Sequence, residues 1–176
     1  MTIEQYIEQS AHQTIRAPER CPKCRKLHVL EHLGYYQRGC TDSAGQVQEI
    51  SISRFECTYC GVTVSCLPEF AQPYRMINNE TTQKFFNGDT ESEDVQRNYT
   101  NLRRYWRKFS VWIKRLKATI GTTLGRAPPQ EPAAGLWRRI LAEHRSLARA
   151  TLMFVQEFRI TCFGLYRCHQ PAMQAV

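Results

Sequence analysis

The sequence predicts an α+β protein in which a small β-hairpin module precedes a mainly α-helical module with two long amphipathic helices. The first observation behind this prediction is a pair of CxxC motifs with 32 residues between them, namely Cys21-Pro22-Lys23-Cys24 and Cys57-Thr58-Tyr59-Cys60. The residues between the motifs alternate between apolar and polar, as in β-strands. The second observation is a helical spacing of apolar residues over the second half of the chain.

The two cysteine pairs predict a metal site. Each pair can form one tight turn that directs two thiolates toward one ion, and two such turns complete the four-sulfur shell that zinc prefers in structural sites. We therefore expect Cys21, Cys24, Cys57 and Cys60 to bind Zn²⁺. A four-cysteine shell has no open position, so the metal is expected to stabilise the fold and not to catalyse. Four unrelated buried cysteines and a redox-active pair are the alternatives.

The whole chain is basic and short. Its 176 residues suffice for one domain or two small modules, and its formal charge of +8 favours polyanionic partners. The N-terminus has neither the basic nor the apolar region of a secretory signal, so we expect the eight cysteines to lie in the reducing cytoplasm. No apolar run reaches 18 residues, and no membrane-spanning helix is expected.

Residues 1–20 are expected to hold a short N-terminal helix over residues 2–17. Thr2 and Gln5 have the spacing of a capping box, and Pro18 ends the helical pattern.

Residues 21–76 form the predicted metal module. Strands are expected over residues 27–38, 47–55 and 62–64, with turn chemistry at residues 41–45. Such a small sheet buries little apolar surface, so the metal should supply much of its stability.

Four further residues in this module are potential metal ligands. His28 and His32 lie in the first strand, but four cysteines already suffice, and we expect surface or packing histidines. Cys40 and Cys66 are expected to be buried thiols.

The second half of this module resembles a known family. The residues that carry the resemblance are Arg54-Phe55-Glu56-Cys57-Thr58-Tyr59-Cys60-Gly61-Val62-Thr63-Val64-Ser65, then Leu67-Pro68, then Pro73-Tyr74-Arg75. They look like the transposon-associated zinc-ribbon domains of bacteria, which carry a CPxC turn, a hairpin, an RxxCxxCGxTxS return and an LP…PY+R exit. The layout is also similar to that of the small zinc-ribbon DNA-binding proteins that accompany insertion-sequence transposases.

The resemblance covers residues 20–76 well and extends more loosely to about residue 110. It implies a zinc-ribbon β-hairpin module, a helix-turn-helix after it, and a role in DNA transactions. Two residues depart from the family pattern. Arg25 stands where the first turn often has glycine, and Cys66 interrupts an apolar run, but neither change removes a ligand.

Residues 77–120 are predicted to be helical, basic and helix-turn-helix-like. A short helix should end at Asn87-Gly88, and a long one should run from a capping box at Thr90 and Glu93 to about Ile120, with a break allowed near residues 98–100. Tyr105 and Trp106 fall on the apolar face, so we expect core packing, with base stacking as the minority alternative.

This helix carries the sequence evidence for function. Nine basic residues and no acidic one lie between Arg97 and Arg126. A face of one sign repels itself unless a polyanion neutralises it, although a solvated basic face is the ordinary alternative. The stretch 100–109 also resembles the recognition-helix end of transposase helix-turn-helix units. The candidate nucleic-acid contacts are Arg97, Asn101, Arg103, Arg104, Arg107, Lys108, Lys114, Arg115 and Lys117.

Residues 121–135 read as a Gly- and Pro-rich linker, and residues 136–176 as a C-terminal amphipathic helix and tail. The helix is expected to run from Leu136 to Phe158 with a wide apolar stripe. Packing within the chain is the default for this stripe, and a homodimer seam is the alternative. Three residues near the C-terminal end could bind a second metal ion, but their spacing is irregular and we expect an ordinary tail there; they are Cys162, Cys168 and His169.

Catalysis is not expected. The sequence has no Gly-rich phosphate loop, and its aspartates, Asp42, Asp89 and Asp94, lie in turn or cap regions and not on a catalytic strand. The predicted function is therefore a zinc-binding protein that binds nucleic acid, DNA in preference to RNA, and targets or regulates a mobile element. The alternative is a protein-interaction adaptor, in which the ribbon and the C-terminal helix dock a partner or a second copy.

Overall fold

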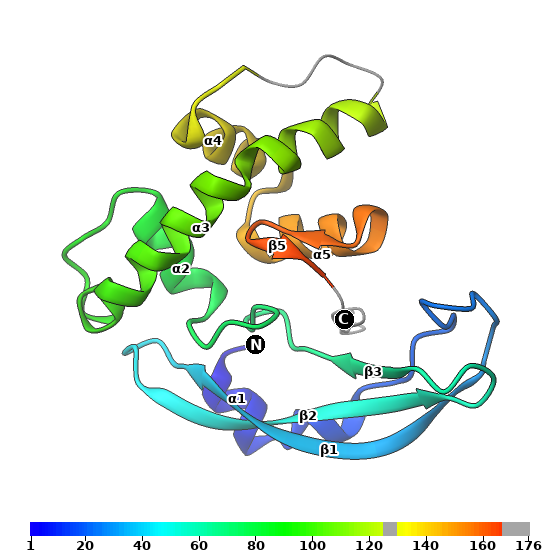
Figure 1. The fold of residues 1–176 in the computed structure, drawn as a ribbon. Helices are drawn as coiled ribbons and strands as arrows, with labels where there is room; N and C mark the ends of the chain where they lie inside the picture. The colour runs from blue at the N-terminus through cyan, green and yellow to red at the C-terminus, as the bar shows by residue number, and fades with distance from the viewer. Residues whose placement is uncertain (125–129, 167–176) are drawn as a thin grey trace. The chain divides into compact units, whose positions relative to one another are not determined.

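The computed structural model describes residues 1–124 and 130–166, and it confirms the α+β class (Figure 1). The chain forms two compact units, residues 1–79 and residues 80–166. The first is built on a small antiparallel sheet, and the second is mainly helical. We refer to them as the sheet unit and the helical unit, and we describe each by itself.

The sheet unit contains three antiparallel strands in the order β1-β2-β3. Their bounds are β1, Leu30–Thr41; β2, Val47–Cys57; and β3, Thr63–Cys66. The predicted strands are thus confirmed, although β1 begins and ends three residues later than expected and β2 continues two residues further. In the β1–β2 hairpin Thr41 pairs with Val47 at the closed end and Leu30 pairs with Cys57 at the open end. The pairing shifts register between His32 and Gly34.

The N-terminal segment packs on this sheet. Its elements are the helix α1, Ile3–Glu8, and the 3₁₀ turn η1, Ala11–Thr14. The predicted capping box is present, because Thr2 N–H donates to Gln5 Oε1 at 2.9 Å and Gln5 N–H donates to Thr2 Oγ1 at 3.3 Å. The prediction of a single helix over residues 2–17 is wrong, because Ser10 adopts a left-handed φ of 47° that interrupts the helix. Tyr6 is fully buried and donates its hydroxyl to Ser51 O.

The helical unit is organised along one long helix, with the shorter helices gathered beside it (Figure 1). Its elements are α2, Asn79–Phe86; α3, Glu93–Leu124; α4, Ala133–His144; α5, Leu147–Phe158; β4, Ile160–Thr161; and β5, Gly164–Leu165. The break allowed near residues 98–100 is absent, because α3 is continuous there.

The prediction of a second long helix from Leu136 to Phe158 is wrong. The segment is two helices, because Arg145 turns left-handed at φ 65° and Ser146 begins a new helix by accepting a hydrogen bond from Arg149 N–H at 3.2 Å. The first helix starts inside the predicted 121–135 linker, at Ala133. Residues 125–129 of that linker lie outside the described part of the chain.

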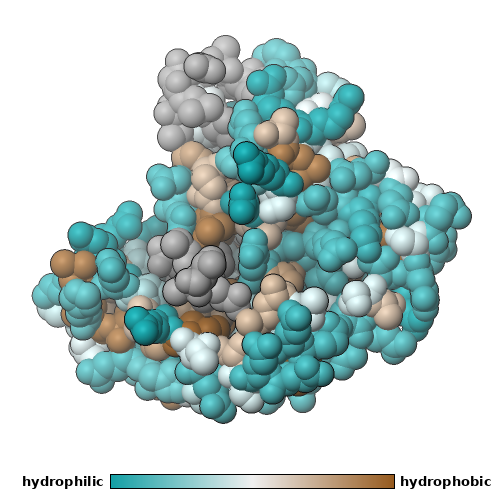
Figure 2. Space-filling view, turned by 180° about the vertical axis from the view of Figure 1, so that it is seen from behind, coloured by the Kyte–Doolittle hydropathy of each residue, from teal (hydrophilic) through white to brown (hydrophobic). Residues whose placement is uncertain are grey.

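The apolar stripe of α4 and α5 is buried within the helical unit. Leu136, Ile140 and Phe154 belong to one core cluster with Phe109 and Leu116 of α3. Packing within the chain, the default prediction, is therefore confirmed for this stripe. On the face of the molecule in Figure 2 hydrophilic residues predominate, and hydrophobic residues appear in small groups among them. Because Leu136, Ile140 and Phe154 lie in the buried cluster, the stripe is not an exposed docking surface.

Candidate metal centre and basic helix

The β1–β2 hairpin brings the two cysteine pairs together. Because Leu30 pairs with Cys57 at the open end of the hairpin, the chain just before β1 lies beside the chain that leaves β2. Thr58 N–H donates to Val29 O at 2.9 Å, which holds the second CxxC turn against the approach to β1. Residues far apart in sequence thus meet because the two strands pair and the Thr58–Val29 hydrogen bond extends that pairing.

The two CxxC turns have the same backbone hydrogen bonds. Cys21 N–H donates to Lys26 O, and Cys57 N–H makes the matching bond to Val62 O, each at 2.9 Å. Cys21 O and Cys57 O each accept a bond from the residue four positions later, Arg25 and Gly61. The two turns therefore have the same backbone conformation around their cysteines, and each directs its thiols in an equivalent way.

The four sulfur atoms are arranged as a tetrahedral ion requires. Cys21 Sγ lies 3.6 Å from Cys60 Sγ, and Cys24 Sγ lies 3.7 Å from Cys57 Sγ. All four lie within 4.8 Å of one another. A tetrahedral zinc ion with Zn–S bonds of about 2.3 Å places its sulfur ligands about 3.8 Å apart. The cluster can therefore hold one metal ion, and it fits the size of zinc.

The ionisation of these thiols depends on their neighbours. Burial opposes the Cys21 thiolate, but the N–H groups of Cys24 and Lys23 stabilise it and lower the pKa of Cys21 to about 7. At Cys60 the Val62 N–H favours the thiolate, yet burial and the neighbouring cysteines raise the pKa to about 11. Adjacent thiolates repel one another, so a bound cation is what allows all four to ionise together.

The remaining candidate ligands lie apart from this cluster. Cys40 and Cys66 are fully buried, and burial raises their pKa values to about 11 and about 12, which confirms them as core thiols. His28 and His32 are exposed, and His32 packs against Phe55 with ring centroids 5.5 Å apart. Among the described residues, the four cysteines are the only group suited to hold an ion.

Of the three residues that could form a second metal site, only Cys162 lies in the described part of the chain. Cys162 is buried in the core of the helical unit, and burial raises its pKa to about 12. Cys168 and His169 lie outside the described residues.

Sequence reasoning missed a basic group at the first CxxC turn. Its members are exposed, and they are Arg16, Arg20, Lys23, Arg25 and Lys26. Lys26 Nζ lies 3.1 Å from the ring centroid of Tyr59, so it links the first turn to the second. The signal was present in the sequence, because Glu19 is the only acid among residues 16–26. Four thiolates around a divalent ion leave net negative charge, which nearby cations stabilise.

The predicted nucleic-acid contacts lie on α3 and face solvent. Eight of the nine candidates are exposed, and Lys117, which donates to Glu131 O, is half-buried. Arg97, Asn101, Arg104, Lys108 and Arg115 recur at intervals of three, four and seven residues, which places them along one line of the helix. The remaining exposed candidates, Arg103, Arg107 and Lys114, form a second line beside the first.

Several of these cations have partners within the helical unit. Arg97 pairs with Glu93 at 2.6 Å, and the Arg103 guanidinium lies 6.0 Å from the ring centroid of Tyr99. Within the described part of the chain, Arg107, Lys108 and Lys114 make no hydrogen bond or ion pair to other side chains. Their charge is thus available to an external anion.

The basic face is long enough to cross a groove of DNA. An α-helix rises about 1.5 Å per residue, so Arg97 and Arg115 are separated by about 27 Å along α3. The major groove of B-DNA is about 12 Å wide. Cations spread over this length can therefore meet phosphates on both sides of one groove.

Tyr105 and Trp106 of α3 pack against the core of the helical unit, as predicted. The ring centroids of Trp106 and Phe86 lie 4.8 Å apart in an edge-to-face pair, and those of Tyr105 and Phe163 lie 5.8 Å apart. The helix-turn-helix arrangement remains a prediction. Residues 87–92 join α2 to α3, which is longer than the turn of about three or four residues in typical units of that kind.

No helix in the described ranges combines the length and the apolar character needed to cross a bilayer. The long helix α3 illustrates why, since basic residues occupy its exposed side from Arg97 to Arg115.

Comparisons with known proteins add a family match without a function. A family model described as a domain of unknown function (DUF6431) matches residues 21–105. No curated protein and no solved structure matches the chain. The matched segment begins at Cys21 and ends at Tyr105, so it contains all four clustered cysteines and the first part of α3.

Proposed function

We propose that this protein is a zinc-stabilised, nucleic-acid-binding protein that contacts duplex DNA through α3. The observation that carries the proposal is the exposed basic face of α3, on which eight candidate residues face solvent and no acid interrupts residues 97–117. Like charges so concentrated repel one another, and a polyanion would remove that cost. Duplex DNA is preferred over RNA because of the resemblance of residues 20–76 to transposon-associated zinc ribbons.

Zinc is proposed as the ion in the four-cysteine cluster, where it would act as a structural staple. The equivalent backbone hydrogen bonds of the two turns and the tetrahedral spacing of the sulfur atoms support this role. The cysteines of the described chain are all free thiols, which fits a reducing compartment such as the bacterial cytoplasm.

A targeting or regulatory role in a mobile element, without catalysis, completes the proposal. The mobile-element role follows from the same resemblance. The absence of catalysis is supported by the local engagement of the aspartates. Asp42 accepts bonds from Ala44 and Gln46 N–H groups, and Asp94 accepts from the Thr81 hydroxyl at 2.7 Å. Asp89 accepts from the N–H groups of the residues that lead into α3.

The test is DNA binding by a charge-reversed helix. Arg104→Glu with Arg107→Glu reverses two exposed cations of α3, and Arg145→Glu with Arg149→Glu is the matched control on the α4–α5 side. Binding to a fluorescent duplex is measured by anisotropy over a range of salt concentrations. The α3 variant should weaken binding and reduce the slope of log K against log salt by about two, since each phosphate contact contributes about one.

The control pair makes the outcome specific, because both double variants change the net charge equally. Equal losses in the two variants would mean that only net charge matters, and unchanged binding in the α3 variant would exclude α3 as the contact surface.

A further inference from the structure

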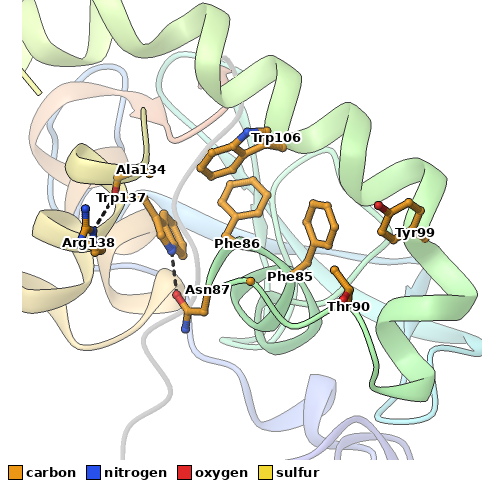
Figure 3. Close-up of a pocket in the computed structure, with 10 residues that line it drawn as sticks. Phe85, Phe86, Asn87, Thr90, Tyr99, Trp106, Ala134, Trp137 and Arg138 are labelled. Carbon is orange, nitrogen blue, oxygen red and sulfur yellow. Dashed lines mark hydrogen bonds between the residues drawn. The ribbon is translucent and has the colours of Figure 1, made fainter. Parts of the chain in front are cut away.

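The helical unit contains a pocket of about 690 Å³ beside α3 (Figure 3). Its walls are mainly aromatic, and the rings come from α2, α3 and α4. They belong to Phe85, Phe86, Tyr99, Trp106 and Trp137. A volume of this size is typical of sites for small organic groups.

The rings support one another through edge-to-face contacts. The ring centroids of Phe86 and Trp137 lie 5.0 Å apart, and those of Phe85 and Tyr99 lie 5.6 Å apart. Trp137 Nε1–H donates to Asn87 Oδ1 at 2.9 Å, as the dashed line in Figure 3 shows. Phe86 and Trp137 are buried, whereas Phe85 and Trp106 are half-buried and Tyr99 is exposed. A further planar group can therefore reach the last three rings, and the two buried rings hold them in place.

The charge on the lining of the pocket is positive. Arg138 is one of the lining residues, and none of the lining residues is acidic. The adjacent Asp89 is engaged elsewhere, because its carboxylate accepts bonds from Glu91 N–H at 2.9 Å and from the Ser92 hydroxyl at 2.7 Å. An anionic ligand with a planar apolar part therefore suits this site better than a neutral apolar peptide.

The pocket adjoins the basic face of α3. Arg103 is four residues after Tyr99 and three before Trp106, so it lies on the same side of the helix as both lining residues. Arg107 lies one turn further along. A strand whose phosphates contact these two arginines would bring its bases toward the aromatic walls.

We infer that this pocket binds an unpaired base of the nucleic acid that α3 holds by its phosphates. The inference rests on the proposed function and adds a preference for single-stranded or locally opened DNA. Stacking on aromatic side chains accepts any base, so the site would be tolerant of sequence.

Filling the pocket without removing a contact tests this inference. Ala134 is an exposed lining residue of α4, and Ala142 is exposed on the same helix outside the pocket. Binding of a fluorescent oligothymidylate and of a duplex of equal length is measured for Ala134→Trp and for the control Ala142→Trp. Ala134→Trp should weaken oligothymidylate binding about tenfold and duplex binding less than about twofold, while Ala142→Trp should change neither.

A second pair of variants distinguishes the loss of a ring from a loss of folding. Tyr99→Leu removes a ring and should weaken oligothymidylate binding, whereas Tyr99→Phe keeps the ring and should not. Circular dichroism confirms that each variant keeps its helices.

The outcomes separate the two proposals. Unchanged oligothymidylate binding by Ala134→Trp and Tyr99→Leu would overturn the base pocket and leave duplex binding by α3 standing. If an amphipathic apolar peptide binds instead and Ala134→Trp blocks it, the occupant is a peptide and the inference is wrong. A wild-type protein that binds neither DNA would overturn the proposed function itself.

Discussion

Arg25 and Gly61 occupy the same position in the two CxxC turns. Their φ angles are 64° and 66°, so both are left-handed. Glycine adopts this conformation without cost, whereas a residue with a Cβ loses about 1 kcal/mol or more. The first turn therefore carries a strain that the second avoids, and a shared metal ion would hold both in place.

This asymmetry predicts opposite effects of two substitutions. Gly61→Ala should weaken zinc binding about fivefold, because about 1 kcal/mol of backbone strain enters the turn. Steric conflict is not the cause, since a Cβ at Gly61 would meet no atom within 4 Å. Arg25→Gly should strengthen binding by a similar factor. Competition with a chromophoric chelator measures both, and a loss of affinity in Arg25→Gly would contradict this account of the turn.

At the scale of elements, Asp94 joins α2 to the first turn of α3. It is only 3% exposed, and it accepts from Thr81 Oγ1 at 2.7 Å and from Lys84 Nζ at 3.2 Å. Burial alone would raise its pKa, but these two partners outweigh burial and lower it. The ionised carboxylate therefore stabilises the junction.

Asp94→Asn should lower the free energy of unfolding by about 1.5 kcal/mol, because it removes a buried charge-assisted pair. Glu93→Gln makes the same chemical change at the exposed neighbour that pairs with Arg97, and it should cost less than about 0.5 kcal/mol. Urea titration followed by tryptophan fluorescence measures both.

The effect at Asp94 should also depend on pH. A carboxyl whose folded pKa is lowered contributes stability above its unfolded pKa of about 3.9, and the contribution disappears as pH falls through the folded value. The difference between wild type and Asp94→Asn should therefore shrink below about pH 4. A difference that persists at lower pH would assign the effect to packing instead.

The division of the second amphipathic helix was not foreseen. Leu136, Ile140, Leu147 and Phe154 follow helical spacing across the break, so periodicity alone predicts one element. The signal was Ser146, which can cap a helix, but serine is common inside helices too. Gln83 of α2 decides the matter, since its Oε1 accepts from Leu147 N–H at 2.9 Å and so supports a new N-terminus.

For the whole molecule, the two units should respond differently to loss of metal. The four-cysteine cluster lies in the sheet unit, whereas Trp106, Trp112 and Trp137, all the tryptophans of the chain, lie in the helical unit. The sheet unit is small, so we expect it to depend on a bound metal ion for its stability, while the helical unit has a core of its own.

Chelation should therefore unfold the sheet unit and spare the helical unit. Excess chelator should make the segment 21–66 sensitive to protease and should leave the tryptophan emission spectrum nearly unchanged. Cys57→Ser should reproduce this state without chelator, and Cys66→Ala, which alters a core thiol, should still bind one zinc ion. A large red shift of tryptophan emission on chelation would show that the units unfold together.

The sequence by itself determined the parts that depend on local spacing. The two CxxC pairs identified the four cysteines that come together, alternation marked the strands, and helical periodicity separated the buried and basic sides of α3. Such features depend on residues close together along the chain, so their pattern is visible without coordinates. The zinc-ribbon family, the DNA partner and the mobile-element role remain predictions.

The tertiary structure alone decided what depends on distant neighbours. The cluster of four sulfur atoms depends on the pairing of Leu30 with Cys57. The start of α5 depends on the hydrogen bond to Gln83, and the aromatic pocket depends on rings from three helices. None of these three contacts can be read from the sequence, because each joins residues that are far apart along the chain and meet only when separate elements pack. Packing of that kind is selected by the complementarity of whole surfaces, which no local pattern encodes.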